Sequence, residues 1–145
     1  MATTYNFTDG SIAGAYVPAE TTLIENQVVV RRNIVDFSLQ TIDVSETDVV
    51  RVINVPANTT VLTAGARVIT AETASSEFDI GYGGNVDQWG DGVSMATANV
   101  TVGCLDAPVY FAAADTIDIT SSGSVDYDGG KIEVFALMLK HTDTL

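Results

Sequence analysis

Short runs rich in β-branched residues recur along the chain from residue 27 onward, and turn residues separate them. Branched side chains fit a pleated sheet better than a helix, and no segment sustains a 3.6-residue apolar period. About eight such runs at regular spacing predict an all-β fold, either a sandwich or a barrel, and of the two we expect an antiparallel, jelly-roll-like β-sandwich. The predicted strands lie within 27–44, 49–55, 59–72, 77–82, 93–103, 107–113, 115–120 and 131–140.

For two of these runs the sequence pattern does not decide the local structure. In Lys131–Lys140 the ALMLK segment has good helix propensity, whereas KIEVF and the short length favour a strand. Apolar residues occur on both faces of this run, as they do in a central strand. Gly65 interrupts the run 59–72 and is compatible with a bulge, a bend or a turn between two strands.

The first 26 residues show no sustained pattern. They mix Gly, Thr and small residues with scattered aromatics, which predicts an extended arm that contains at most one short strand. We therefore expect an N-terminal arm over residues 1–26 and a β-sandwich domain over residues 27–145. The arm is expected to pack poorly on its own subunit and to become ordered in an assembly.

Charge and composition restrict the partners of the chain. Its 145 residues include 19 acidic and 6 basic side chains, a net charge of −13, which disfavours nucleic-acid partners and anionic membranes. No run approaches the length of a membrane span, and the N-terminus lacks the basic and apolar regions of a signal peptide. A hydrophobic content of 46% excludes intrinsic disorder.

The groups required for catalysis are scarce. The single histidine, His141, lies near the C-terminus, where we expect a solvated tail residue. The single cysteine, Cys104, has no histidine nearby in the sequence to activate it, so a small buried residue is expected. No nucleophile elbow, P-loop or dinucleotide fingerprint is present. The sequence therefore predicts a protein that is not an enzyme and has no cofactor.

The stretch FDIGYGGNVDQWGDG, Phe78–Gly92, is the one segment that suggests a binding site. Asp79, Asp87 and Asp91 are candidate calcium ligands, since calcium prefers carboxylate and carbonyl oxygens. Their spacing is not that of an EF-hand, and a long loop between strands is the favoured interpretation. Trp89 either caps the end of the core or anchors a protein interface, and the pattern leaves both open.

Aromatic residues near loops and in the arm are the candidate interface residues. A second acidic loop, Ser124–Gly130, surrounds one of them and is interpreted as a turn. The candidates are Trp89, Tyr82, Tyr127, Tyr5 and Phe7.

Four motifs carry a resemblance to a known family. They are Pro56–Val61 (PANTTV), Gly65–Glu72 (GARVITAE), Ala113–Asp118 (AADTID) and Lys131–Ala136 (KIEVFA). Together they resemble small virion proteins of tailed phages, of which cyanophages carry many. The resemblance covers roughly Asp48–Leu139, so the arm falls outside it.

The resemblance implies a structural role in the virion. Its members are expected to be β-sandwiches, and the role implied here is a capsid decoration, or cement, subunit that binds and stabilises the phage head. The implied partner is the major capsid protein, and the implied assembly is a homotrimer on the head surface, formed in the host cytoplasm. An arm could add a strand to a neighbour's sheet edge. The alternative is a carbohydrate- or calcium-binding recognition module of a phage tail or fibre, built on the Phe78–Gly92 stretch.

Overall fold

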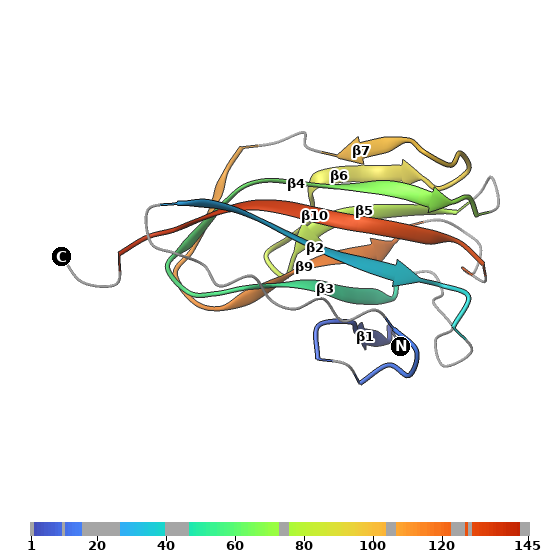
Figure 1. The fold of residues 1–145 in the computed structure, drawn as a ribbon, viewed down its shortest axis with the longest axis horizontal. Helices are drawn as coiled ribbons and strands as arrows, with labels where there is room; N and C mark the ends of the chain where they lie inside the picture. The colour runs from blue at the N-terminus through green and yellow to red at the C-terminus, as the bar shows by residue number, and fades with distance from the viewer. Residues whose placement is uncertain are drawn as a thin grey trace.

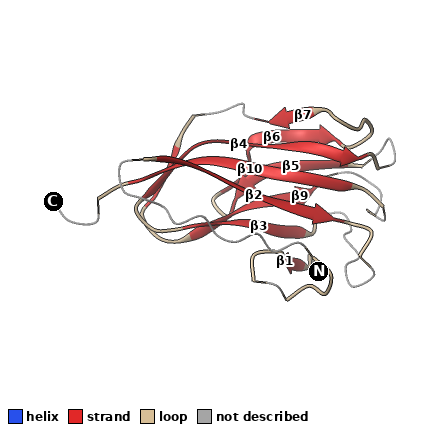
Figure 2. Cartoon of the chain, viewed as in Figure 1, coloured by secondary structure: helices blue, strands red, loops and turns tan. Residues whose placement is uncertain are grey.

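The computed structural model describes residues 2–9, 11–15, 27–39, 47–72, 76–103, 107–122, 127 and 129–142. In these residues all regular structure is β, with no helix (Figure 2), and therefore no helix long and apolar enough to cross a membrane. The strands are β1 (Thr4–Asn6), β2 (Val28–Asp36), β3 (Val49–Val55), β4 (Thr59–Thr70), β5 (Glu77–Tyr82), β6 (Asn85–Ser94), β7 (Thr101–Gly103), β8 (Val109–Phe111), β9 (Asp115–Ser121) and β10 (Lys131–Lys140).

The strands form two sheets that pack face to face. Sheet I has the order β1-β3-β9-β5-β6, and sheet II has the order β2-β10-β4-β7, with β8 also pairing with β4. Strands far apart in the sequence therefore lie side by side, as β2 with β10 and β3 with β9. Figure 1 shows β1 and β7 at opposite margins of the molecule. The predicted all-β sandwich is confirmed, with ten strands described where about eight were expected.

The C-terminal run is the central strand of sheet II. β10 pairs antiparallel with β2 on one side and with β4 on the other. Alternate residues, from Ile132 to Met138, are buried between the sheets, while Phe135 and Leu137 are half-buried on the outer face. Strand pairing on both sides thus overrides the helix propensity of ALMLK. Gly65 lies inside a continuous β4, and the two register irregularities of the β4–β10 pair fall elsewhere in that strand.

The segment expected to be a long loop is instead half of a hairpin. Residues 83–84 form the turn between β5 and β6, so the predicted strand over 93–103 is wrong in its bounds. The sequence signal failed because glycines break the apolar alternation of β6, while two register irregularities between β5 and β6 absorb the extra residues. At Gly81 an added side chain would collide with the backbone of the turning strand at the Asn85 carbonyl oxygen, which requires glycine there.

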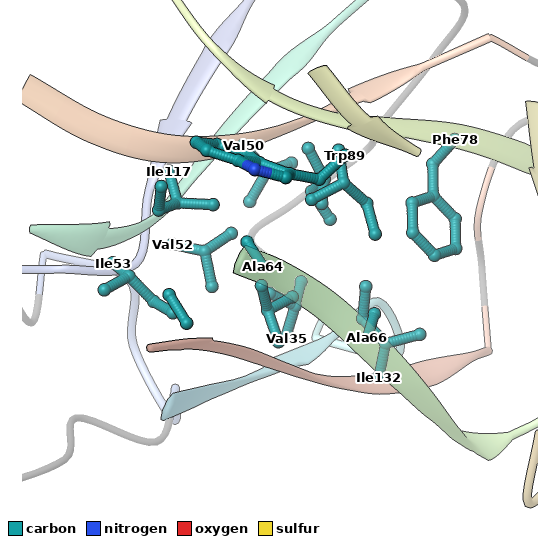
Figure 3. Close-up of a cluster of buried hydrophobic side chains, with 14 of the residues drawn as sticks. Val35, Val50, Val52, Ile53, Ala64, Ala66, Phe78, Trp89, Ile117 and Ile132 are labelled. Carbon is teal, nitrogen blue, oxygen red and sulfur yellow. The ribbon is translucent and has the colours of Figure 1, made fainter. Parts of the chain in front are cut away.

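One continuous apolar core fills the space between the sheets (Figure 3). Both sheets supply branched side chains, and sheet I also supplies the large rings of Phe78 and Trp89, all of them fully or almost fully buried. The central strand of sheet II supplies small and medium residues opposite them, such as Ala136. Large rings and small side chains therefore share one core, as the close packing of protein interiors requires.

The N-terminal residues are part of this core. β1 pairs parallel with β3, and the Phe7 side chain that follows it is fully buried. The Asn33 side-chain amide donates hydrogen bonds to the carbonyl oxygens of Phe7 and Val52, at 3.0 and 2.9 Å. The expectation that the arm packs poorly on its own subunit is therefore wrong for residues 2–9. Residues 16–26 lie outside the described residues, and the domain boundary at residue 26 stays a prediction.

Candidate interaction surfaces

Trp89 belongs to the interior of the sandwich. Its side chain is fully buried on β6 (Figure 3). Its ring centroid lies 6.0 Å from that of Tyr82 on β5. The hairpin turns the indole inward because Trp89 occupies a position of β6 that faces sheet II. Of the two interpretations left open by the sequence, the position of Trp89 matches a core residue, and a buried ring offers no surface to a sugar or a partner.

The three candidate calcium ligands do not converge. The Asp79 carboxylate accepts a hydrogen bond of 2.8 Å from the backbone N–H of Gly92, where the backbone adopts the left-handed conformation (φ +57°). Asp87 and Asp91 are exposed on β6. Within the described residues no three acidic, histidine or cysteine side chains form a group that could hold a metal ion. Asp79 therefore acts as a structural acceptor that fixes the hairpin.

The other aromatic candidates divide into buried and half-buried residues. Phe7 is fully buried, and Tyr127 is almost fully buried, with its ring 4.8 Å from that of Phe37 and its hydroxyl donating to the Glu77 carbonyl oxygen. Tyr5 and Tyr82 are half-buried and pack against the core. An interface role stays a prediction for these two, whereas the buried rings have little surface for a partner.

His141 differs from its expected role as a solvated tail residue. It is half-buried, its backbone N–H donates to the Asn58 carbonyl oxygen, and its Nε2 lies 2.7 Å from Thr60 Oγ1. The edge of the Tyr110 ring packs against it at 5.7 Å between centroids. The pairing of β10 with β4 carries the histidine onto the sheet, which sequence position alone did not reveal. Cys104 and residues 124–126 of the second acidic loop lie outside the described residues.

The outer face of sheet II is a surface that the sequence analysis missed. The strand register places outward side chains in cross-strand rows, one of which runs Val28–Leu139–Thr60–Tyr110 and the next Val30–Leu137–Thr63. The third row runs Arg32–Phe135–Gly65. The sequence feature that pointed to this surface was the apolar character of both faces of Lys131–Lys140. That feature indicated a central strand, but it did not show that the described residues leave one face uncovered. We call this surface the outer patch; it comprises Val28, Val30, Tyr110, Phe135, Leu137 and Leu139.

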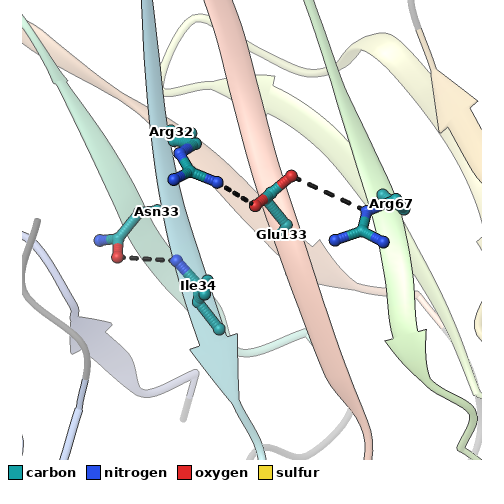
Figure 4. A network of polar contacts seen from close by, with 5 residues as sticks. All are labelled: Arg32, Asn33, Ile34, Arg67 and Glu133. Carbon is teal, nitrogen blue, oxygen red and sulfur yellow. Dashed lines mark hydrogen bonds and ion pairs between the residues drawn. The ribbon is translucent and has the colours of Figure 1, made fainter.

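Charged side chains from the third and fourth rows border the outer patch (Figure 4). Glu133 on β10 lies between Arg32 on β2 and Arg67 on β4, with N–O distances of 2.8 and 3.8 Å. One row further along, Lys131 pairs with Asp36 at 2.8 Å. Glu133 is mostly covered, whereas Arg32 and Arg67 are largely exposed. The guanidinium groups therefore give this border a positive character.

The two sheets differ in charge. The strands of sheet I carry one basic and six acidic residues, a net −5, whereas those of sheet II carry five basic and two acidic residues, a net +3. One sheet I carboxylate is buried: Asp118 on β9 is 9% exposed, and this burial raises its pKa to about 6. The hydrogen bond from Thr116 and the charge of Arg51 lower the pKa of Asp118, while the charge of Asp115 raises it. The molecule is thus polarised between an acidic and a mildly basic face.

Comparisons with known proteins identify the fold. No protein-family model and no curated protein matches the sequence. Among solved structures, a chain in the capsid of Ralstonia phage GP4 matches with a TM-score of 0.66 and 12% identity, over 97% of this chain and 99% of that chain. A chain of the cyanophage Pam1 capsid asymmetric unit matches with a TM-score of 0.57 and 17% identity, over 88% and 95%.

A third match is a chain in the acidic stable capsid structure of Helicobacter pylori bacteriophage KHP30. Its TM-score is 0.61 at 10% identity, over 82% of this chain and 92% of that chain. Each of these chains is covered almost completely, so the likeness concerns whole domains and not a shared substructure. At these identities the likeness establishes the fold: the chain has a β-sandwich fold that is also found in chains of phage capsids, in agreement with the resemblance seen in its motifs.

Proposed function

We propose that the chain is a structural protein of a tailed-phage virion, specifically a capsid decoration (cement) subunit that binds the major capsid protein and stabilises the head. The observation that carries this proposal is the full-length likeness to a chain in the capsid of Ralstonia phage GP4. The resemblance of the Asp48–Leu139 motifs to small virion proteins points the same way from independent information.

The physical character of the molecule supports this proposal. A cement subunit needs a rigid body, a soluble outer surface and an adhesive area. The continuous core supplies rigidity, and the acidic strands of sheet I supply a strongly hydrated face. The outer patch of sheet II supplies exposed apolar area, including Val28 and Val30, each more than half exposed.

The assembly state and the location belong to the same proposal. We propose a homotrimer on the head surface, assembled in the host cytoplasm, because closed cyclic symmetry lets one adhesive area per subunit act three times on a shell. A role of the N-terminal arm, residues 1–26, in adding a strand to a neighbour's sheet edge belongs to the same proposal. We favour this role over the glycan- or calcium-binding alternative, because Trp89 is buried and the described residues hold no group of three candidate metal ligands.

The test is binding of the purified protein to capsids that lack it. We expect saturable co-sedimentation with the capsids and a higher temperature of capsid disruption when the protein is bound. Light scattering of the free protein measures its mass in solution. A protein that neither sediments with the capsids nor raises their heat resistance would rule out the cement role.

A further inference from the structure

We propose that the outer face of sheet II is the surface that docks on the capsid shell, and that its partner presents an apolar centre bordered by acidic side chains. This inference rests on the proposed function and specifies which surface performs it. Sheet I then faces away from the shell. The proposal follows from the exposure, the charge and the size of the outer patch.

The exposure of the outer patch is unusual for this molecule. Five large hydrophobic residues in the described part of the chain are exposed, and three of them lie on this face: Val28 (55%), Val30 (54%) and Tyr110 (56%). Leu137 and Leu139 lie between them on β10. A cluster of exposed apolar residues in adjacent rows marks an interaction site better than the same residues scattered singly.

The rows also provide a rigid platform. Val28 and Val30 have stiff branched side chains, and the outward side chains of β10 are held by strands on both sides. Ordering such a surface on binding costs little conformational entropy, because its side chains have few rotamers to lose. The Tyr110 hydroxyl donates to the Asn58 side chain at 2.9 Å, which fixes the ring at the margin of the outer patch.

Charge identifies the kind of partner. Arg32 and Arg67 border the outer patch and share one carboxylate, Glu133, so these three side chains together carry one net positive charge. A complementary surface therefore carries acidic side chains opposite this border and apolar side chains opposite the outer patch. The chain has a net charge of −13, so most of its surface repels an acidic partner. The outer face of sheet II repels such a partner least.

The size of the outer patch argues against a second copy as the occupant. Three rows across about four strands cover on the order of 400 Å², from strand spacings of about 4.8 Å and row spacings of about 6.8 Å. A stable dimer buries about 800 Å² on each partner. The outer patch alone is too small for that, but on a shell it is repeated with every subunit, so that weak contacts add up.

The outer face of sheet I lacks these properties. Its strands carry the net charge of −5, and the exposed large hydrophobic residue on them is Val86 (48%), on the edge strand β6. Val86 is therefore a matched control: a valine of similar exposure on a strand of the other sheet. Arg51, exposed on β3, is likewise a matched control for Arg32.

The experiment compares binding of variants to capsids that lack the protein. Val28→Glu/Val30→Glu is expected to weaken binding about tenfold or more, because it places charge where the shell is apolar. Val86→Glu is expected to bind like the wild type. The milder Val28→Ser/Val30→Ser variant repeats the test if the glutamates disturb edge strand β2, and melting temperatures within a few degrees of the wild type show that each variant folds.

Salt dependence and solution mass distinguish a capsid-docking surface from a self-association surface. Arg32→Gln is expected to weaken binding at low salt more than at high salt, whereas Arg51→Gln leaves binding unchanged. If the wild type fails to bind capsids, the proposed function fails. If the wild type binds and both valine double variants bind equally well, the docking surface is wrong. A fall in the solution mass of the double variants would also overturn the inference, because the outer patch would then hold a second copy.

Discussion

Asp118 lies in the middle of β9, where its carboxylate has little contact with water. Its register neighbours are Arg51 on β3 and Gly81 on β5, and it accepts a hydrogen bond of 2.6 Å from the Thr116 hydroxyl. Burial is the largest influence and raises the pKa of Asp118 from 3.8 to about 6. A neutral isostere at this position should therefore stabilise the protein at neutral pH.

Proton linkage gives the direction in which the stability contribution of Asp118 changes with pH. Because the pKa of Asp118 is higher in the folded state, this group favours folding while it is protonated, below pH 4. That contribution is lost as the pH rises from about 4 to about 6. A shift of this size corresponds to at most about 3 kcal/mol, and partial contact with solvent reduces it to about 1–2 kcal/mol. Asp118→Asn has no charge to bury, and its side-chain oxygen can still accept the Thr116 hydrogen bond.

The assay is urea unfolding at two pH values. At pH 7.5, Asp118→Asn is expected to unfold with a free energy about 1–2 kcal/mol above that of the wild type, and at pH 4 the difference should nearly vanish. Asp87→Asn, at an exposed position of β6, controls for the loss of one negative charge from the chain. An Asp118→Asn protein that is less stable than the wild type at pH 7.5 would refute the reasoning, because the Arg51 contact would then outweigh the cost of burial.

Three further changes test the packing and the surface by urea unfolding. Trp89→Ala should cost about 3–5 kcal/mol, as truncations of large buried aromatics do, and a loss below about 1 kcal/mol would contradict a core position. Phe7→Ala should cost about 3 kcal/mol, because the ring is fully buried; an unchanged stability would restore the arm as an independent segment. Glu133→Gln should lower the free energy of unfolding by about 1 kcal/mol at low salt and by less at 1 M salt. A loss that is independent of salt would argue against the ion pairs of Glu133 with Arg32 and Arg67.

The alternation and composition of the sequence were sufficient to determine the fold class. The period of two in Glu77–Tyr82 and Asp115–Ser121, and the two apolar faces of Lys131–Lys140, each correspond to a strand in the structure. These signals are local: each depends only on which neighbouring side chains share a face of an extended chain. The motifs of Asp48–Leu139 also indicated the fold that the solved phage capsid chains share.

The candidate site depended on contacts between segments far apart in the chain. The sequence could not decide whether Trp89 caps the core or meets a partner, because burial depends on sheet II lying opposite β6. Nor could it show that β1 joins β3 and buries Phe7, since parallel pairing leaves no local signature.

The outer patch likewise depends on contacts between segments far apart in the chain. Val28 and Tyr110 are 82 positions apart, yet the registers of β2, β10, β4 and β8 place them in one row. Sequence periodicity showed that β10 has two apolar faces, but not that one of them remains uncovered by described residues. Alternation along the chain determined most of the strands, although not β6, whose glycines break the pattern. Only the pairing of the strands decided which apolar faces became core and which became surface.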